Sequence, residues 1–148
     1  MSERASQMAG VVSCIDAQLM SAAGSVTGDV IDASLYDSIL FVASIGNVSS
    51  CSGDVTLTIY EGTATATVTT TVGTTAHNST STGDNNVQLI FDLDCDNLTG
   101  PNYRYVKPRL TYAGGTGAQV SMVALGMKPR FHPASDGDLA TVTIKTST

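Results

Sequence analysis

Three aspartates at alternate positions have the spacing in this chain that is most similar to a metal-binding loop. Asp92, Asp94 and Asp96 present the alternate carboxylates with which a calcium-binding loop begins. The sixth position of such a loop, however, is Asn97 instead of glycine, and the twelfth is Tyr103 instead of a bidentate glutamate. We therefore interpret these residues as solvated carboxylates at a strand end, with a weak, irregular cation site as the alternative, and we expect no metal and no cofactor.

The three cysteines are Cys14, Cys51 and Cys95, and none belongs to a Cys-x-x-Cys pair, so zinc binding is poorly supported. If successive strands reverse direction, the loops that hold Cys51 and Cys95 lie at opposite ends of the fold. That separation exceeds the few ångströms that a disulfide spans. We expect small, inert thiols, at least one of which is outside any intrachain pair.

No local arrangement supplies a catalytic nucleophile. The histidines His77 and His132 lie far apart, and no serine sits in a Gly-x-Ser-x-Gly turn. The turn GGTG at 114–117 lacks the Lys-Ser/Thr pair and the following helix that would bind phosphate. We expect that the protein is not an enzyme.

Three tyrosines late in the chain are candidates for a sugar-binding site. Tyr103, Tyr105 and Tyr112 could together form an aromatic platform. Packing in a core or an interface is the commoner use of such side chains. A carbohydrate-binding module therefore stays open as an alternative function.

Basic residues are concentrated in one segment of an acidic chain. The formal net charge is −6, and no Lys or Arg lies between Arg4 and Arg104. Five of the seven cations fall between 103 and 130, namely Arg104, Lys107, Arg109, Lys128 and Arg130. So acidic a chain repels a phosphate backbone, and we expect no nucleic-acid partner. The five cations are candidate contacts to an acidic protein surface or a neighbouring subunit, and solvated charges at strand edges are the alternative.

Short strands must position these residues. Only 14% of the 148 residues are charged, and the abundance of Thr, Ser, Gly, Ala and Val favours strands and tight turns over helices. Apolar residues alternate in 54–61 and 87–93, while 39–45 is apolar on both faces and should be central. The threonine-rich segment after Gly62 should lie near a sheet edge. Seven or eight short strands predict an all-β fold, an antiparallel β-sandwich or jelly roll.

The stretch from Tyr103 to Arg130 is predicted to form two strands joined by a glycine hairpin. Pro108 lacks an N–H donor, so the first of these strands should have an edge or a bulge there.

The domain boundaries follow from these strands. We expect an N-terminal arm over 1–24, with an alternative short helix at 16–20, a β-sandwich domain over 25–133, and a C-terminal tail over 134–148 with a possible added strand at 141–144. No segment approaches the ~20 apolar residues of a membrane span, so we expect no membrane partner. The apolar run Met8 to Val12 is also shorter than the hydrophobic region of an export signal, which has roughly 7 to 15 residues, so we expect no export by that route.

Two segments resemble small proteins encoded beside the major capsid protein of tailed bacteriophages. They are DVIDASLYDSILFVASIG followed by VTLTIYEG, and RYVKPRLTYAGG followed by a strand that leads into KPRFHP. The resemblance implies a head decoration, or cement, protein that binds the outer capsid surface, with the major capsid protein as its partner. It also implies synthesis in the cytoplasm of the host bacterium and a homo-oligomer, for which a trimer is favoured. A tail or neck protein of the same kind of virion is the alternative within this class.

Overall fold

The computed structural model of the chain describes residues 8–48, 54–77, 86–114 and 117–130. These residues form nine strands and three short 3-10 helices. The strands are β1 (Ala9–Met20), β2 (Gly24–Thr27), β3 (Ile31–Asp32), β4 (Tyr36–Val48), β5 (Val55–Gly62), β6 (Thr70–His77), β7 (Val87–Asp94), β8 (Tyr105–Tyr112) and β9 (Ala118–Pro129). The 3-10 helices are η1 (Ala33–Leu35), η2 (Thr65–Thr67) and η3 (Cys95–Asn97). Within this part of the chain, no helix is long and apolar enough to cross a membrane.

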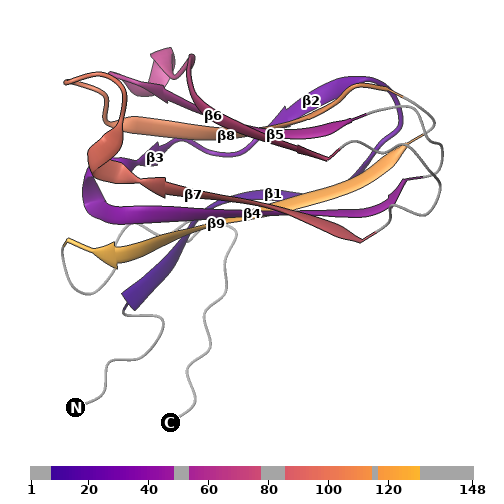
Figure 1. Cartoon of the computed structure of the whole chain (residues 1–148), viewed down its shortest axis with the longest axis horizontal. Coiled ribbons are helices and arrows are strands. Elements are labelled where there is room, and N and C mark those ends of the chain that lie inside the picture. Colours follow the sequence, from indigo (N-terminus) through magenta and orange to yellow (C-terminus); the bar gives the residue numbers. More distant parts are fainter. Residues whose placement is uncertain (1–7, 49–53, 78–85, 115–116, 131–148) are drawn as a thin grey trace, which may run out of the picture.

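The strands form two antiparallel sheets that pack face to face, which confirms the predicted β-sandwich (Figure 1). The sheet that we call the β4 sheet has the strand order β1-β9-β4-β7. The other, the β8 sheet, has the order β2-β8-β5-β6, and β3 also pairs with β8. Strand β4 lies between two neighbours, as its apolar pattern predicted. The threonine-rich strand predicted over 63–72 is wrong for its first part, because residues 65–67 form η2; the strand that follows, β6, begins at Thr70 and lies at the sheet edge.

The core lies between the two sheets because alternate side chains of each strand point inward. In β4 these are Ile39, Phe41, Ala43 and Ile45, all at most 1% exposed. On the opposite sheet, β5 and β8 contribute buried side chains at alternate positions. They are Val55, Leu57 and Ile59 from β5, and Val106, Leu110 and Tyr112 from β8. This inward set accounts for the alternation in the sequence.

The predicted hairpin over Tyr103 to Arg130 is wrong. Strand β8 lies in one sheet between β5 and the β2/β3 edge, whereas β9 lies in the other sheet between β1 and β4. Neither strand has a free side left for the other, so the connection crosses between the sheets. Gly114 and Gly117, with φ of 131° and 140°, flank this crossing. Both strands bury alternate residues in one core, and that pattern is the same whether two strands share a sheet or face each other.

The predicted N-terminal arm is wrong for residues 9–20, and so is the alternative helix at 16–20. These residues form β1, which pairs with β9 along the edge of the β4 sheet and buries Val12, Ile15 and Met20. Its register shifts between Val11 and Ser13, and again between Ile15 and Gln18. Each bulge reverses the inward alternation, which explains why no clean period was visible. The predicted tail over 134–148, with its possible strand, lies outside the described residues.

Pro108 is accommodated by a break in the neighbouring strand. The edge of the β8 sheet is interrupted between Thr27, the last residue of β2, and Ile31, the first of β3. In this break the N–H of Gly28 donates to the Pro108 carbonyl at 3.0 Å. A Cβ on Gly28 would lie 2.5 Å from the Ser13 hydroxyl oxygen and 2.9 Å from the Pro108 Cγ, so a larger residue would have to displace both. The irregularity predicted at Pro108 therefore falls on β2/β3, and β8 stays continuous.

Candidate interaction surfaces

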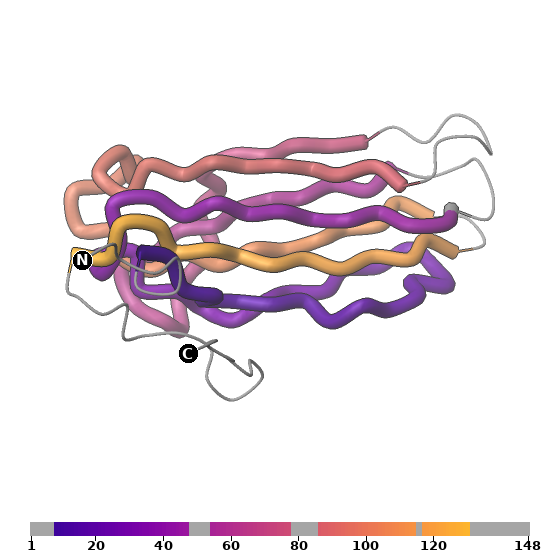
Figure 2. Tube along the Cα trace, turned by 90° about the horizontal axis from the view of Figure 1, so that it is seen from below, coloured from indigo at the N-terminus to yellow at the C-terminus, as the bar shows by residue number. Residues whose placement is uncertain are grey.

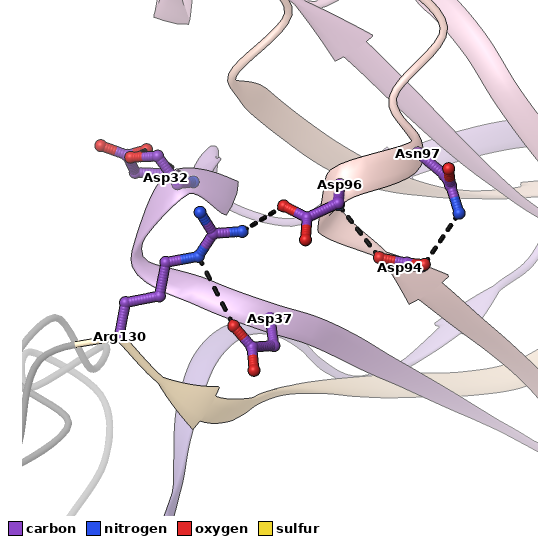
Figure 3. A network of polar contacts seen from close by, with 7 residues as sticks. Asp32, Asp37, Asp94, Asp96, Asn97 and Arg130 are labelled. Atoms are coloured by element: carbon purple, nitrogen blue, oxygen red, sulfur yellow. Dashed lines mark hydrogen bonds and ion pairs between the residues drawn. The ribbon is translucent and has the colours of Figure 1, made fainter.

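Two of the three alternate aspartates, Asp94 and Asp96, lie at η3 at one end of the sandwich (Figure 3), whereas Asp92 lies within β7 opposite Leu40. The Asp94 carboxylate accepts the backbone N–H of Asp96 at 3.0 Å and the side-chain amide of Asn97 at 2.8 Å. Asp94 is thus the N-cap of η3. Within the described residues, no group of three or more His, Cys, Asp or Glu could hold a metal ion.

Arg130 is bound by two acidic side chains at the same end. Its guanidinium donates to the Asp96 carboxylate, and its Nε lies 3.6 Å from the Asp37 carboxylate (Figure 3). Its backbone N–H donates to the Leu35 carbonyl at 2.9 Å, which holds the end of β9 against η1. The hydrogen bond to Asp96 raises the pKa of Arg130. This cation is therefore occupied within the chain.

Arg104 is likewise occupied, by Asp32. The Arg104 Nε lies 2.8 and 2.9 Å from the two Asp32 carboxylate oxygens, and Asp32 also accepts the backbone N–H of Ser34 as the N-cap of η1. Burial alone would raise the pKa of Asp32, but the hydrogen bonds from Arg104 and Ser34 hold it below its usual value. The Arg104 guanidinium lies 5.4 Å from the centre of the Tyr105 ring, within cation–π range.

Two of the predicted cations share the outer face of the β8 sheet, which we call the basic face. Lys107 and Arg109 are two residues apart on β8, so both point away from the core. Arg109 lies in a row with Thr27, Thr58 and Thr74, and Lys107 lies opposite Tyr60. Neither cation forms an ion pair in the described part of the chain. The Arg109 Nε is buried and meets no acceptor among those residues.

The five predicted docking cations therefore do not form one patch. Lys128 is exposed near the end of β9 and has a left-handed backbone conformation, with φ of 48°. Arg104 and Arg130 are in ion pairs at the η1 and η3 end. Only Lys107 and Arg109 are brought together as cations without an acidic partner in the described chain.

The tyrosines do not form the sugar platform that the sequence suggested. Tyr112 points into the core and is 1% exposed. The Tyr103 hydroxyl lies 3.3 Å from the Thr70 hydroxyl, where it joins the loop before β8 to β6. Tyr105 alone of the three lies on the basic face.

The outer face of the β4 sheet carries a second surface, which we call the apolar face. Partners across an antiparallel sheet point to the same side, so the strand register defines rows of neighbours. Two adjacent rows are apolar along most of their length. One runs Cys14, Val123, Val42 and Ile90, and the next runs Val11, Leu125, Leu40 and Asp92. Of these eight side chains, only Asp92, at the β7 edge, is charged.

The side chains of the apolar face are accessible. Ile90 is 58% exposed, and the aliphatic residues of β1, β4 and β9 in the two rows are half-buried. The half-buried apolar residues that pack against the core are a different set, Val26, Leu35, Val72, Phe91 and Leu98. Figure 2 shows β1, β9, β4 and β7 side by side, and no other strand of the described chain lies over them. The sequence had shown Leu40 and Val42 only as the second face of a central strand.

A shallow hollow of about 380 Å³ adjoins the apolar rows. Its floor is made of small residues at neighbouring positions of β4 and β9, including Ser44, Gly46 and Ser121. Leu19, which is 61% exposed, forms part of its wall where β1 passes its second bulge. The same face thus has both protruding apolar side chains and a recess.

Two buried side chains, Glu61 and Cys95, lie outside both surfaces; the sequence analysis missed the first and left the state of the second open. Glu61 is completely buried at the end of β5 and accepts hydrogen bonds from Thr99. Glu61 continues the alternation of Val55, Leu57 and Ile59, so the sequence could have indicated that its side chain points into the core. Burial raises the pKa of the Cys95 thiol to about 12, in agreement with an inert thiol, while Cys51 lies outside the described residues.

Comparisons with known proteins give little beyond the geometry. No protein-family model matches the chain, and no curated protein matches it. Among solved structures, the chain is similar to the structure of the infectious bursal disease virus Gt strain, with 17% identity and a TM-score of 0.48. The match covers 85% of this chain and 33% of that one, so the chain spans about a third of the length of that protein.

Proposed function

We propose that this protein is a structural component of a bacteriophage virion, which binds the outer surface of the capsid and stabilises it. The observation that carries the proposal is the basic face, where Lys107 and Arg109 point outward without an acidic partner in the described chain. The similarity of the two segments quoted above to phage decoration proteins supports the same role. The partner would be the major capsid protein.

The chemistry of the basic face suits an acidic protein surface. Threonine hydroxyls flank Arg109 and can donate to or accept from a partner, and they lose less free energy on desolvation than charged groups would. The Lys107 ammonium can donate a charge-assisted hydrogen bond to a partner carboxylate. On a chain of net charge −6, such a face also orients the molecule as it approaches an acidic surface.

The test is cosedimentation of the purified protein with expanded capsids of the virus that encodes it, followed by imaging of the particles. We expect stoichiometric density on the outer lattice, with binding that weakens as salt is added. Lys107→Glu should weaken binding about tenfold or more, because it reverses a charge at a complementary contact. Lys128→Glu, the matched charge change at the end of β9, should leave binding close to that of the wild type.

Other outcomes would overturn the proposal. Density at the portal or along the tail would instead support a tail or neck protein. Absence from every particle, together with saturable glycan binding that Tyr105→Ala abolishes, would support a carbohydrate-binding module. Equal loss of capsid binding in Lys107→Glu and Lys128→Glu would remove the basic face as the contact.

A further inference from the structure

We propose that the apolar face of the β4 sheet is a self-association interface, at which two copies of this chain meet face to face around a twofold axis. The inference goes beyond capsid binding and does not depend on it, because it concerns the opposite side of the sandwich. Its occupant is a second copy of the same face.

The charge of the apolar face favours a second copy. The whole chain carries a formal net charge of −6, so two copies repel each other wherever acidic surfaces meet. In the two apolar rows, the acidic group is confined to Asp92 at the β7 edge, and the centre formed by β9 and β4 is uncharged. This centre can therefore contact its own copy without burying a charge, which is the costly event at an interface.

The strand register also selects one orientation of the two copies. A twofold axis that runs along the strands between β9 and β4 places each row over the same row of the second copy. Val123 then faces Val42 of the second copy, and Leu125 faces Leu40. The axis also places β7 over β1, so Asp92 lies away from its own equivalent. An axis across the strands would set the two β7 edges together and is disfavoured by like charge.

The shape of the face agrees with a self-complementary contact. An isologous interface requires that one surface supply both protrusions and recesses. In the orientation above, the exposed Ile90 of β7 faces the smaller side chain of Cys14 on β1 of the second copy. Two packed sheets would lie about 10 Å apart with strands at about 30°, as the sheets of a sandwich do.

The size of the face predicts a reversible dimer. Four strands at about 4.8 Å spacing and about eight residues along β9 give roughly 500 Å² for each copy. A standard stable interface buries about 800 Å² on each partner, so a face of this size suits a weak, reversible dimer. A trimer would need two different contact patches on every copy. A twofold contact needs this face alone, so the face supports a dimer.

Sedimentation equilibrium of the full chain over a wide range of micromolar concentrations tests the proposal. We expect a monomer–dimer equilibrium that added salt does not weaken. Ile90→Asp and Val123→Asp should each raise the dissociation constant about a hundredfold or more, because a twofold interface buries each new charge twice. Ile90 is 58% exposed, so its substitution should leave folding intact even if Val123→Asp does not.

The matched control is Thr74→Asp, which places the same charge on an exposed position of the β8 sheet. This variant should dimerise as the wild type does. A monomer at every concentration would overturn the proposal. An oligomer that persists in Ile90→Asp and Val123→Asp would also overturn it.

Discussion

The buried carboxylate of Glu61 accepts the backbone N–H of Thr99 at 3.0 Å, and the Thr99 hydroxyl donates to its other oxygen. These hydrogen bonds join the end of β5 to the loop that follows η3. They compensate for the free-energy cost of desolvating a carboxylate at an inward-facing position. Glu61 is therefore structural, although a buried carboxylate is also a common sign of a catalytic site.

The first prediction concerns this pair. Glu61→Gln replaces the charge-assisted hydrogen bonds from Thr99 with neutral ones, and it adds a second N–H to a buried site that offers it no acceptor among the described residues. We expect a loss of about 1–3 kcal/mol in the free energy of unfolding. Urea denaturation measures it. Asp16→Asn, the same chemical change on an exposed residue of β1, should change stability by less than about 0.5 kcal/mol, and equal effects would contradict the structural role.

The second prediction is a pH dependence set by Asp32 and Arg104. The pKa of Asp32 is lower in the folded state than its ordinary value of 3.8, so the unfolded chain binds this proton first as the pH falls. The stabilisation is complete above about pH 5 and is lost as the pH falls through 3.8 toward the folded pKa. Because the Arg104 side chain is 52% exposed, the effect should be about 1 kcal/mol or less.

The measurement is the urea midpoint of the wild type and of Asp32→Asn at about pH 6 and about pH 3. The wild type should lose more stability between the two pH values than the variant does. Asp16→Asn should keep the dependence of the wild type. A wild-type slope retained in Asp32→Asn would show that other carboxylates are responsible.

The third prediction concerns a close backbone approach. A Cβ on Gly62 would lie 2.3 Å from the Thr67 carbonyl oxygen, a backbone atom that cannot rotate away. Gly62→Ala should therefore lower the unfolding free energy by about 1–3 kcal/mol through overpacking. At Gly24, where the nearest atom is 3.9 Å away, the same substitution should be nearly neutral. Thermal unfolding of the two variants compares them directly, and equal melting temperatures would count against this packing.

Much of the sandwich could be predicted from local patterns because its central strands alternate without interruption. The alternation in β5 and the double apolar pattern of β4 located these strands and their inward faces. Strand β1 could not be found this way, since its two bulges reverse the alternation within 12 residues. The pairing of β8 and β9 could not be found either, because inward alternation does not record which sheet a strand joins.

The candidate surfaces were harder to predict because they depend on contacts between distant residues. Arg104 and Arg130 have the same composition signal as Lys107 and Arg109, yet Asp32 and Asp96 occupy the first pair. Those acidic partners are 72 and 34 residues away in the sequence. The apolar face likewise assembles side chains from four strands, and only the register shows that they form rows.

The last prediction tests the orientation of the proposed dimer. If Val123 faces Val42 of the second copy, then Val123→Asp and Val42→Lys should each be largely monomeric alone, because each buries an unpaired charge. When the two variants are mixed, the carboxylate introduced in one copy would meet the ammonium introduced in the other, while the second contact keeps both valines. Sedimentation equilibrium of the mixture should then show a heterodimer. A mixture that stays monomeric, although both variants are folded by circular dichroism, would contradict an axis along the strands. As a control, Val123→Asp is mixed with Lys107→Glu, a substitution on the opposite sheet. The apolar face of Lys107→Glu is unaltered, so the new carboxylate at position 123 would face a valine, and this mixture should not restore dimerisation of Val123→Asp.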